Sequence, residues 1–234
     1  MDAVSDRDFV ADFLYASSML MVHLSRFSED IILWMSSEFR LVRVDESVTT
    51  GSSMLPQKRN PDAAELARGK CGRITGHLLG LLMTLKGLPL TYNKDLQEDK
   101  EAVFDAVDTL ELMLPVFRVM VETLEVDPKR AAALLEGGHL EALSAADYLV
   151  RKGMPFRDAH DAVGQLVRLA DESGKSLPGL DLSQYKKISD LFEDDVFGAV
   201  GAAGSVADKD VIGGTAPGRV REEILRWKKE LSET

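Results

Sequence analysis

Residues 51–61, with the sequence GSSMLPQKRNP, hold the side chains that most clearly suggest a reaction. Gly51 and the two serines after it predict a loop that presents hydroxyl groups. Lys58 and Asn60 follow at the start of an expected helix, whose first free N–H groups favour an anion. A hydroxyl, an ammonium, an amide and a helix N-terminus would then converge. They suit a substrate carboxylate and the charge it gains when a neighbouring proton is removed. Composition alone also allows an ordinary Ser-rich loop before a helix.

The order of these residues resembles the signature loop of the fumarase/aspartase superfamily, S-S-x-M-P-x-K-x-N-P. One departure is visible, because Leu55 stands before the proline where Met is usual. An apolar exchange of this kind should alter packing more than chemistry. The resemblance implies that Ser52 is the general base acting on a Cβ proton of a succinyl group. It also implies that Lys58 stabilises the developing negative charge and that Asn60 contacts the substrate.

The flanking sequence is similar to the argininosuccinate lyase family within this superfamily. Residues 82–101, LMTLKGLPLTYNKDLQEDKE, carry this likeness, together with the opening MDAVSDRDFV and the closing GGTAPGRVR. The resemblance covers essentially the whole chain. It implies that Lys100 binds a substrate carboxylate and that Tyr92 and Gln97 supply neutral hydrogen bonds to the substrate.

These residues also have plain structural interpretations. Tyr92 could be a surface tyrosine before a turn, and Lys100 a solvated charge in an acidic stretch. Arg7 is a weaker candidate, either structural or adjacent to the substrate. Glu65 is another, because it can offset the dipole of the second helix.

The reaction implied by the resemblance is reversible elimination of argininosuccinate to L-arginine and fumarate, in arginine biosynthesis. The family uses no metal or organic cofactor and forms homotetramers whose active sites are shared between subunits. Two family regions, with an Arg-Asn pair and a Thr-His pair, have no counterpart here. We therefore expect little or no lyase activity from the chain alone. The four histidines show no paired spacing typical of metal ligands; they are His23, His77, His139 and His160.

Two alternatives to this function remain open. One is a non-catalytic structural or assembly protein on the same scaffold, like the lens delta-crystallins. The other is adenylosuccinate lyase, whose signature loop is similar but which does not share the segment YNKDLQEDK.

The predicted fold is all-α, because apolar residues recur at helical spacing and β-branched runs of period two are absent. We expect long helices at about 9–35, 60–87 and 98–125. In the first of these, one face carries apolar residues at helical spacing: Phe9, Phe13, Ala16, Leu20 and Leu24. Shorter helices are expected near 141–152, 156–172 and 183–192, before a last helix capped by Thr215. The predicted domains are a long-helix bundle, residues 1–126, and a small helical C-terminal domain, residues 127–234.

The predicted start of the second helix has Asn60 as N-cap and Pro61 in the first helical position. The helix is apolar on more than one face, and such a helix must be buried on most sides. In a chain of this size, other copies of the protein would provide that burial. The sequence therefore favours a homo-oligomer.

The 234 residues are 45% hydrophobic and 29% charged, which is typical of a globular protein. The formal net charge is −11 and no basic stripe offsets it, so we do not expect nucleic-acid binding. No apolar run reaches the roughly 20 residues that a membrane span needs. Cys71 is the single cysteine, which suits a reducing compartment, and the opening residues do not resemble a signal peptide. We expect a cytoplasmic protein.

Overall fold

The computed structural model describes residues 2–51, 54, 59–135 and 138–233. The chain divides into two compact units, Met1–Ala131 and Ala132–Thr234, and each is described by itself. Within the described residues the secondary structure is almost entirely helical, which confirms the predicted all-α fold class. None of the helices in this part of the chain is both long and apolar enough to span a membrane.

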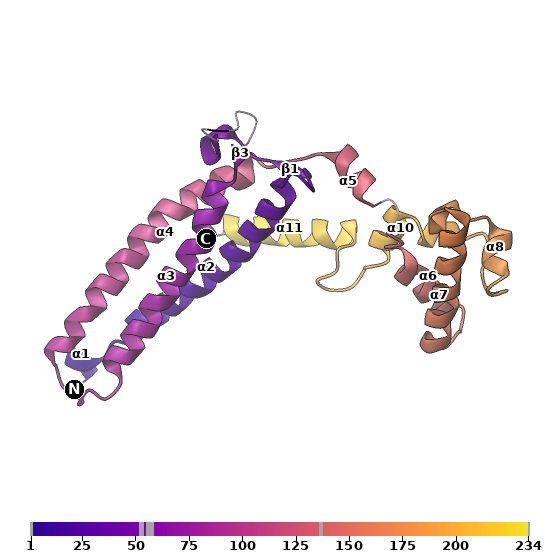
Figure 1. Ribbon diagram of the computed structural model, residues 1–234. Helices are drawn as coiled ribbons and strands as arrows, with labels where there is room; N and C mark the ends of the chain where they lie inside the picture. Colours follow the sequence, from indigo (N-terminus) through magenta and orange to yellow (C-terminus); the bar gives the residue numbers. More distant parts are fainter. Residues whose placement is uncertain (1, 52–53, 55–58, 136–137, 234) are drawn as a thin grey trace. The chain divides into compact units, whose positions relative to one another are not determined.

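Three long helices form the first unit (Figure 1). α3 packs against both α2 and α4, so it links the bundle together. The predicted long helices match the observed ones to within three residues at each end. The helices and 3-10 turns of this unit are α1 Asp2–Ser5, α2 Asp8–Met35, η1 Glu46–Val48, α3 Asp62–Leu85, η2 Lys94–Glu98 and α4 Asp99–Glu122.

Two short antiparallel ladders, which the sequence did not predict, organise one end of this bundle. β1 (Val42–Arg43) pairs with β4 (Glu125–Val126), just after α4. β2 (Thr50–Gly51) pairs with β3 (Arg59–Asn60), immediately before α3. Each strand has only two residues, so no period-two pattern could reveal it.

The predicted N-caps of two helices were wrong. Asn60 lies in β3, and Pro61 is the residue at the N-cap of α3, without a side-chain cap. Ladder pairing with β2 holds the Asn60 backbone extended, so the helix begins one residue later, with Pro61 at its N-cap. Thr215 likewise does not cap the last helix, because Ala216 occupies that position.

The face of α2 that its own unit buries is not the apolar face noted in the sequence. Val10, Leu14 and Met21 lie in the core, whereas Phe9 is 67% exposed and Phe13 is 37% exposed. α2 is apolar on two sides, and helical periodicity cannot tell which side faces its own chain. The two core clusters of the unit join α2 to α3 and α4; they centre on Leu14, Met21, Ile74 and Ala106, and on Ile31, Ala67, Met113 and Phe117.

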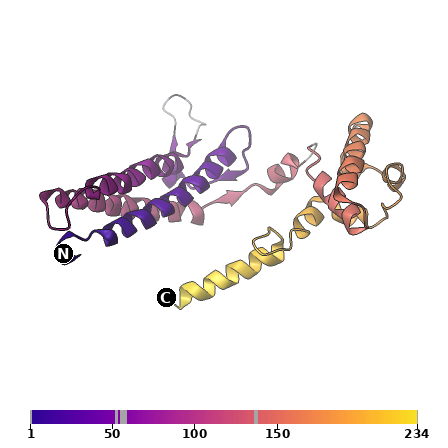
Figure 2. The same cartoon turned by 90° about the horizontal axis from the view of Figure 1, so that it is seen from below.

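The second unit is built of shorter helices around its own core (Figures 1 and 2). The predicted helix at 183–192 ends early, at Lys186. α5 runs across the division between the units, and its bounds and those of the later elements are α5 Pro128–Leu134, α6 Ala142–Arg151, α7 Phe156–Ser173, η3 Leu177–Gly179, α8 Leu182–Lys186, α9 Val196–Ala199, α10 Ala202–Ala207 and α11 Pro217–Ser232.

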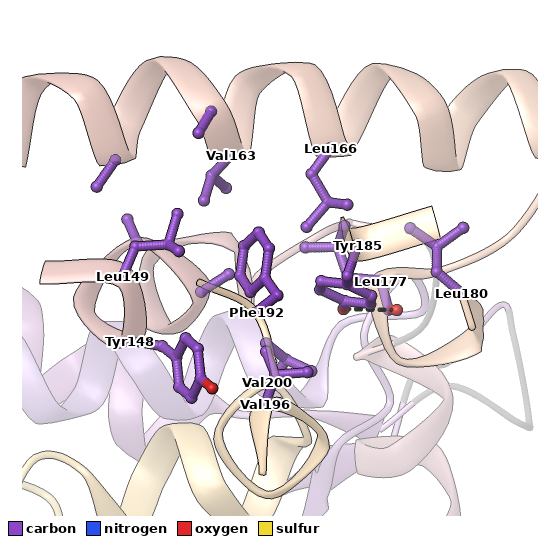
Figure 3. Close-up of a cluster of buried hydrophobic side chains, with 14 of the residues drawn as sticks. Tyr148, Leu149, Val163, Leu166, Leu177, Leu180, Tyr185, Phe192, Val196 and Val200 are labelled. Carbon is purple, nitrogen blue, oxygen red and sulfur yellow. Dashed lines mark hydrogen bonds between the residues drawn. The ribbon is translucent and has the colours of Figure 1, made fainter. Parts of the chain in front are cut away.

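Aromatic residues fill the centre of this second core. Figure 3 shows Phe192 facing Val163 and Leu166 of α7. The Tyr185 ring meets Phe192 edge-on, with ring centroids 5.0 Å apart. The Tyr185 hydroxyl donates a hydrogen bond of 2.8 Å to the Leu177 carbonyl, so its buried polar group is satisfied.

Gly204 marks a close backbone approach in this unit, where α10 passes α9. A Cβ atom at this position would overlap the carbonyl oxygen of Gly198. Gly204→Ala should therefore lower the free energy of unfolding of the second unit by about 1–3 kcal/mol. Chemical denaturation followed by circular dichroism measures the change.

A matched glycine provides the control for this prediction. Gly164 lies inside α7 with open space where its Cβ would be. Gly164→Ala should leave the stability unchanged or raise it by up to about 1 kcal/mol, because alanine favours the helix. Equal stability of the two variants would contradict the close approach at Gly204.

Candidate active site

The first group of predicted site residues lies at the β2–β3 end of the bundle. Asn60 of β3 is half-buried and pairs with Thr50 of β2. The Thr50 hydroxyl donates a hydrogen bond to the Asp62 carboxylate in the first turn of α3. These contacts fix the base of the signature loop at the helix N-terminus. The predicted catalytic residues Ser52 and Lys58 lie outside the residues that the structure describes.

A cavity of about 530 Å³ opens beside this loop base. Arg59 pairs with Glu46 across 2.5 Å on its wall. The lining mixes these charges with apolar side chains, which are Met35 at the end of α2, Val44, and Leu124 just after α4. The cavity thus offers both signs of charge next to the loop, with an arginine that could face a carboxylate.

The second group lies in the connection between α3 and α4 and in the first turn of α4. Gln97 Nε2 donates a hydrogen bond of 2.7 Å to the Tyr92 hydroxyl. Lys100 Nζ donates one of 2.7 Å to Asp99 Oδ1. The structure therefore joins Tyr92 to Gln97 and places Lys100 in the adjoining turn, held by an acidic neighbour.

Asp99 is a residue of this group that the sequence analysis did not single out. It is only 5% exposed and also accepts a hydrogen bond of 2.5 Å from Arg7 Nε. Burial raises the pKa of the Asp99 carboxyl, but hydrogen bonds from Lys100 and Arg7 outweigh it, and the pKa lies below its usual value. The ionised carboxylate holds Lys100 beside Arg7. In the sequence, Asp99 is one of three acidic residues within 98–101, and only its burial sets it apart.

The Lys100 ammonium can therefore serve an anionic ligand from a fixed position. One of its three donors is engaged by Asp99, and its side chain is still 47% exposed. An ammonium held in this way suits a carboxylate, while Tyr92 and Gln97 suit neutral polar groups. Arg7 is structural in this arrangement, because its side chain is mostly buried against Asp99.

These two groups lie at opposite ends of the first unit (Figure 1). Asn60 precedes α3 and Tyr92 follows it, and α3 has 24 residues. At 1.5 Å per residue the helix separates them by about 36 Å. The described base of the signature loop and the Tyr92–Lys100 segment of one copy are therefore too far apart to contact the same small molecule.

Other polar clusters in the described residues do not resemble a metal centre. Arg73 of α3 forms a two-point ion pair with Asp105 of α4, and His77 lies 2.5 Å from the same carboxylate. These contacts set the register of the two helices. Within the described part of the chain, no group of three His, Cys, Asp or Glu side chains could hold a metal ion.

Comparison with protein families identifies two matching regions. Residues 1–76 match a family described as "Lyase", and residues 139–207 match one described as "Argininosuccinate lyase C-terminal". The argininosuccinate lyase of Pelotomaculum thermopropionicum is 54% identical over 233 residues. That alignment covers 100% of this chain and 51% of the relative.

Solved structures share the fold at lower identity. The crystal structure of EDDS lyase in complex with formate has a TM-score of 0.83 and 24% identity, covering 99% of this chain and 48% of that chain. A class II fumarase from Schistosoma mansoni has a TM-score of 0.64 and 18% identity, covering 86% of this chain and 40% of that chain. The chain therefore shares its helical fold with these solved structures. Over its whole length the chain is similar to curated argininosuccinate lyases, and it spans about half the length of these relatives.

Proposed function

We propose that this chain forms part of an argininosuccinate lyase, which eliminates fumarate reversibly from argininosuccinate and releases L-arginine in arginine biosynthesis. The proposal rests on the similarity of the whole chain to argininosuccinate lyases and on the residues that the chain retains. It has the signature loop with Ser52 and Lys58, and it has Asn60, Tyr92, Gln97 and Lys100.

The proposed active sites are shared between copies of the chain in a homotetramer. The observation that carries this proposal is the separation of about 36 Å between the two groups of site residues. A loop from one copy must then meet the Tyr92–Lys100 segment of another. Exposed apolar side chains on all three long helices support such an assembly; they include Phe9, Tyr15, Leu66, Leu79, Met83, Phe104 and Leu112.

In the proposed reaction, Ser52 removes a proton from Cβ of the succinyl group. Lys58 and the N-terminus of α3 stabilise the negative charge that spreads onto the adjacent carboxylate. The electron pair then forms the double bond of fumarate as the bond from carbon to the guanidinium nitrogen breaks. A serine hydroxyl is too weak a base at neutral pH, so its surroundings must activate it when the loop meets the substrate.

Lys100 has a separate part in this proposal. Its ammonium, held by Asp99, binds a carboxylate of the substrate and fixes the succinyl group against the loop. Tyr92 and Gln97 orient the same ligand by neutral hydrogen bonds. The general acid for the departing nitrogen is expected from the family regions that have no counterpart in this chain.

Fumarate release from argininosuccinate, followed by ultraviolet absorbance, tests the proposal. The assay compares the chain alone, the N-terminal half of the Pelotomaculum thermopropionicum relative alone, and the two together. Activity should appear only in the mixture, because the chain holds one part of each site. Sedimentation shows whether a tetramer has formed.

Two results would contradict this account in different ways. Fumarate release by the chain alone would contradict the proposal that the chain holds only part of each active site. An assembled, folded tetramer of both halves that releases no fumarate would contradict the lyase function and support a structural protein on the same scaffold.

A further inference from the structure

Helix α11 has an apolar stripe that its own unit leaves exposed. Val220, Ile224 and Trp227 are each nearly half exposed, and Leu231 is 70% exposed. None of the described residues of α11 is buried. Figure 2 shows α11, in yellow, as one continuous helix. An isolated helix of 16 residues is marginal in water, so α11 needs a partner for its stripe.

The spacing of the stripe indicates what kind of partner fits. Val220, Ile224, Trp227 and Leu231 follow one another at intervals of four, three and four residues. That is the d-a-d-a order of a coiled-coil heptad. A cavity of about 430 Å³ runs along this face, lined by the stripe and by Gly213 and Gly214. The seam is therefore open for a second helix.

The charges beside the seam have a consistent order. In this heptad frame the e positions are Arg221 and Lys228, and the g positions are Glu223 and Glu230. Both cations thus lie along one edge and both anions along the other. Within the described part of the chain, neither Arg221 nor Lys228 forms an ion pair, whereas Glu223 and Glu230 each form an exposed ion pair with Arg226 of the same helix. The basic edge is free to meet an acidic edge.

This order of charges selects the orientation of the partner. In a parallel pair, the g position of one helix meets the following e position of the other, so Glu223 meets Lys228 on both sides of the seam. In an antiparallel pair, e meets e and g meets g, which would set cation against cation and anion against anion. A second copy of α11 in parallel orientation therefore matches this helix in both shape and charge.

We propose that α11 pairs in parallel with α11 of a second copy of the chain, about a two-fold axis along the helices. The seam has only two heptads, which is less than the area a stable dimer usually buries. The pairing therefore adds to a larger interface between copies of the chain. It determines which two copies have their second units side by side. The proposal does not depend on the lyase function, because it concerns neither the signature loop nor the Tyr92–Lys100 segment.

Site-specific cross-linking of the full chain tests this pairing. In a Cys71→Ala background, Leu231→Cys places a thiol at an a position, which meets its own counterpart in a parallel pair. Lys229→Cys is the matched control, on the outer face of the same turn. Under mild oxidation, Cys at position 231 should form disulfide-linked dimers at least about tenfold faster than Cys at position 229.

The charges supply a second measurement with the same readout. Lys228→Glu sets two carboxylates against each other and should slow cross-linking at position 231 by about fivefold. Adding Glu223→Lys to it should restore the rate, because the pairs are then reversed, with circular dichroism confirming that α11 remains helical. Equal rates at positions 229 and 231 would overturn the pairing. Preferential cross-linking between Val220→Cys and Leu231→Cys chains would overturn the parallel orientation.

Discussion

Ser52→Ala should abolish fumarate release by the assembly of the chain with the N-terminal half of a relative. The expected loss in kcat is about 10²- to 10⁴-fold, because general acid–base catalysis contributes that much. Substrate binding should change little, since alanine removes a single hydroxyl. The ultraviolet absorbance of fumarate under saturating argininosuccinate gives kcat directly.

Ser53→Ala is the matched control for this loss. It removes an identical hydroxyl group from the next residue of the same loop. It therefore tests whether catalysis needs the hydroxyl at position 52 in particular. We expect less than about a fivefold decrease in kcat. If Ser52→Ala kept more than a tenth of the kcat, or if Ser53→Ala were the more damaging change, the assignment of the base would be wrong.

Much of the fold could be predicted from the sequence because its signals are local. Apolar residues at helical spacing predict α2, α3 and α4, and breaks such as Gly87-Leu-Pro89 mark their ends. Pairing between segments that are far apart in the sequence gives no such local signal. The β2–β3 ladder depends on backbone hydrogen bonds that no side chain encodes, and it displaced the predicted N-cap from Asn60 to Pro61.

The choice of buried face on α2 could not be predicted for a related reason. Val10 and Leu14 face α3 and its neighbours in the same chain, while Phe9 and Phe13 are left exposed. Both faces are apolar, and in the proposed tetramer both would be covered. A single sequence shows that both faces are apolar, but it does not show which face packs within its own chain and which packs against another copy.

The residues of the candidate site also divide into those that the sequence predicts and those that only the structure reveals. The order of residues in the signature loop and in YNKDLQEDK predicts Asn60, Tyr92, Gln97 and Lys100 as site residues by resemblance. Asp99 was missed, because a buried carboxylate held by Arg7 differs from its acidic neighbours only in three dimensions. The separation between the two groups of residues depends on one continuous α3, which the helical pattern did predict.

The central claim of this account is that the loop and the Tyr92–Lys100 segment of one chain serve different active sites. It predicts recovery of activity when two inactive variants are assembled together. Ser52→Ala damages one end of the bundle and Lys100→Met the other, and each should be inactive by itself. In mixed assemblies, a site is intact when its signature loop comes from a Lys100→Met chain and its Lys100 comes from a Ser52→Ala chain. Random assortment of equal amounts gives about a quarter of such sites.

The measurement is fumarate release by the co-assembled variants, each combined with the N-terminal half of the relative. A mixture of Ser52→Ala with Lys58→Met is the control, because both changes damage the same loop and no intact site can arise. About a quarter of the unmodified activity in the first mixture, with none in the control, is the predicted result. No recovery in a properly mixed tetramer would contradict the account, because the loop and Lys100 would then come from the same copy.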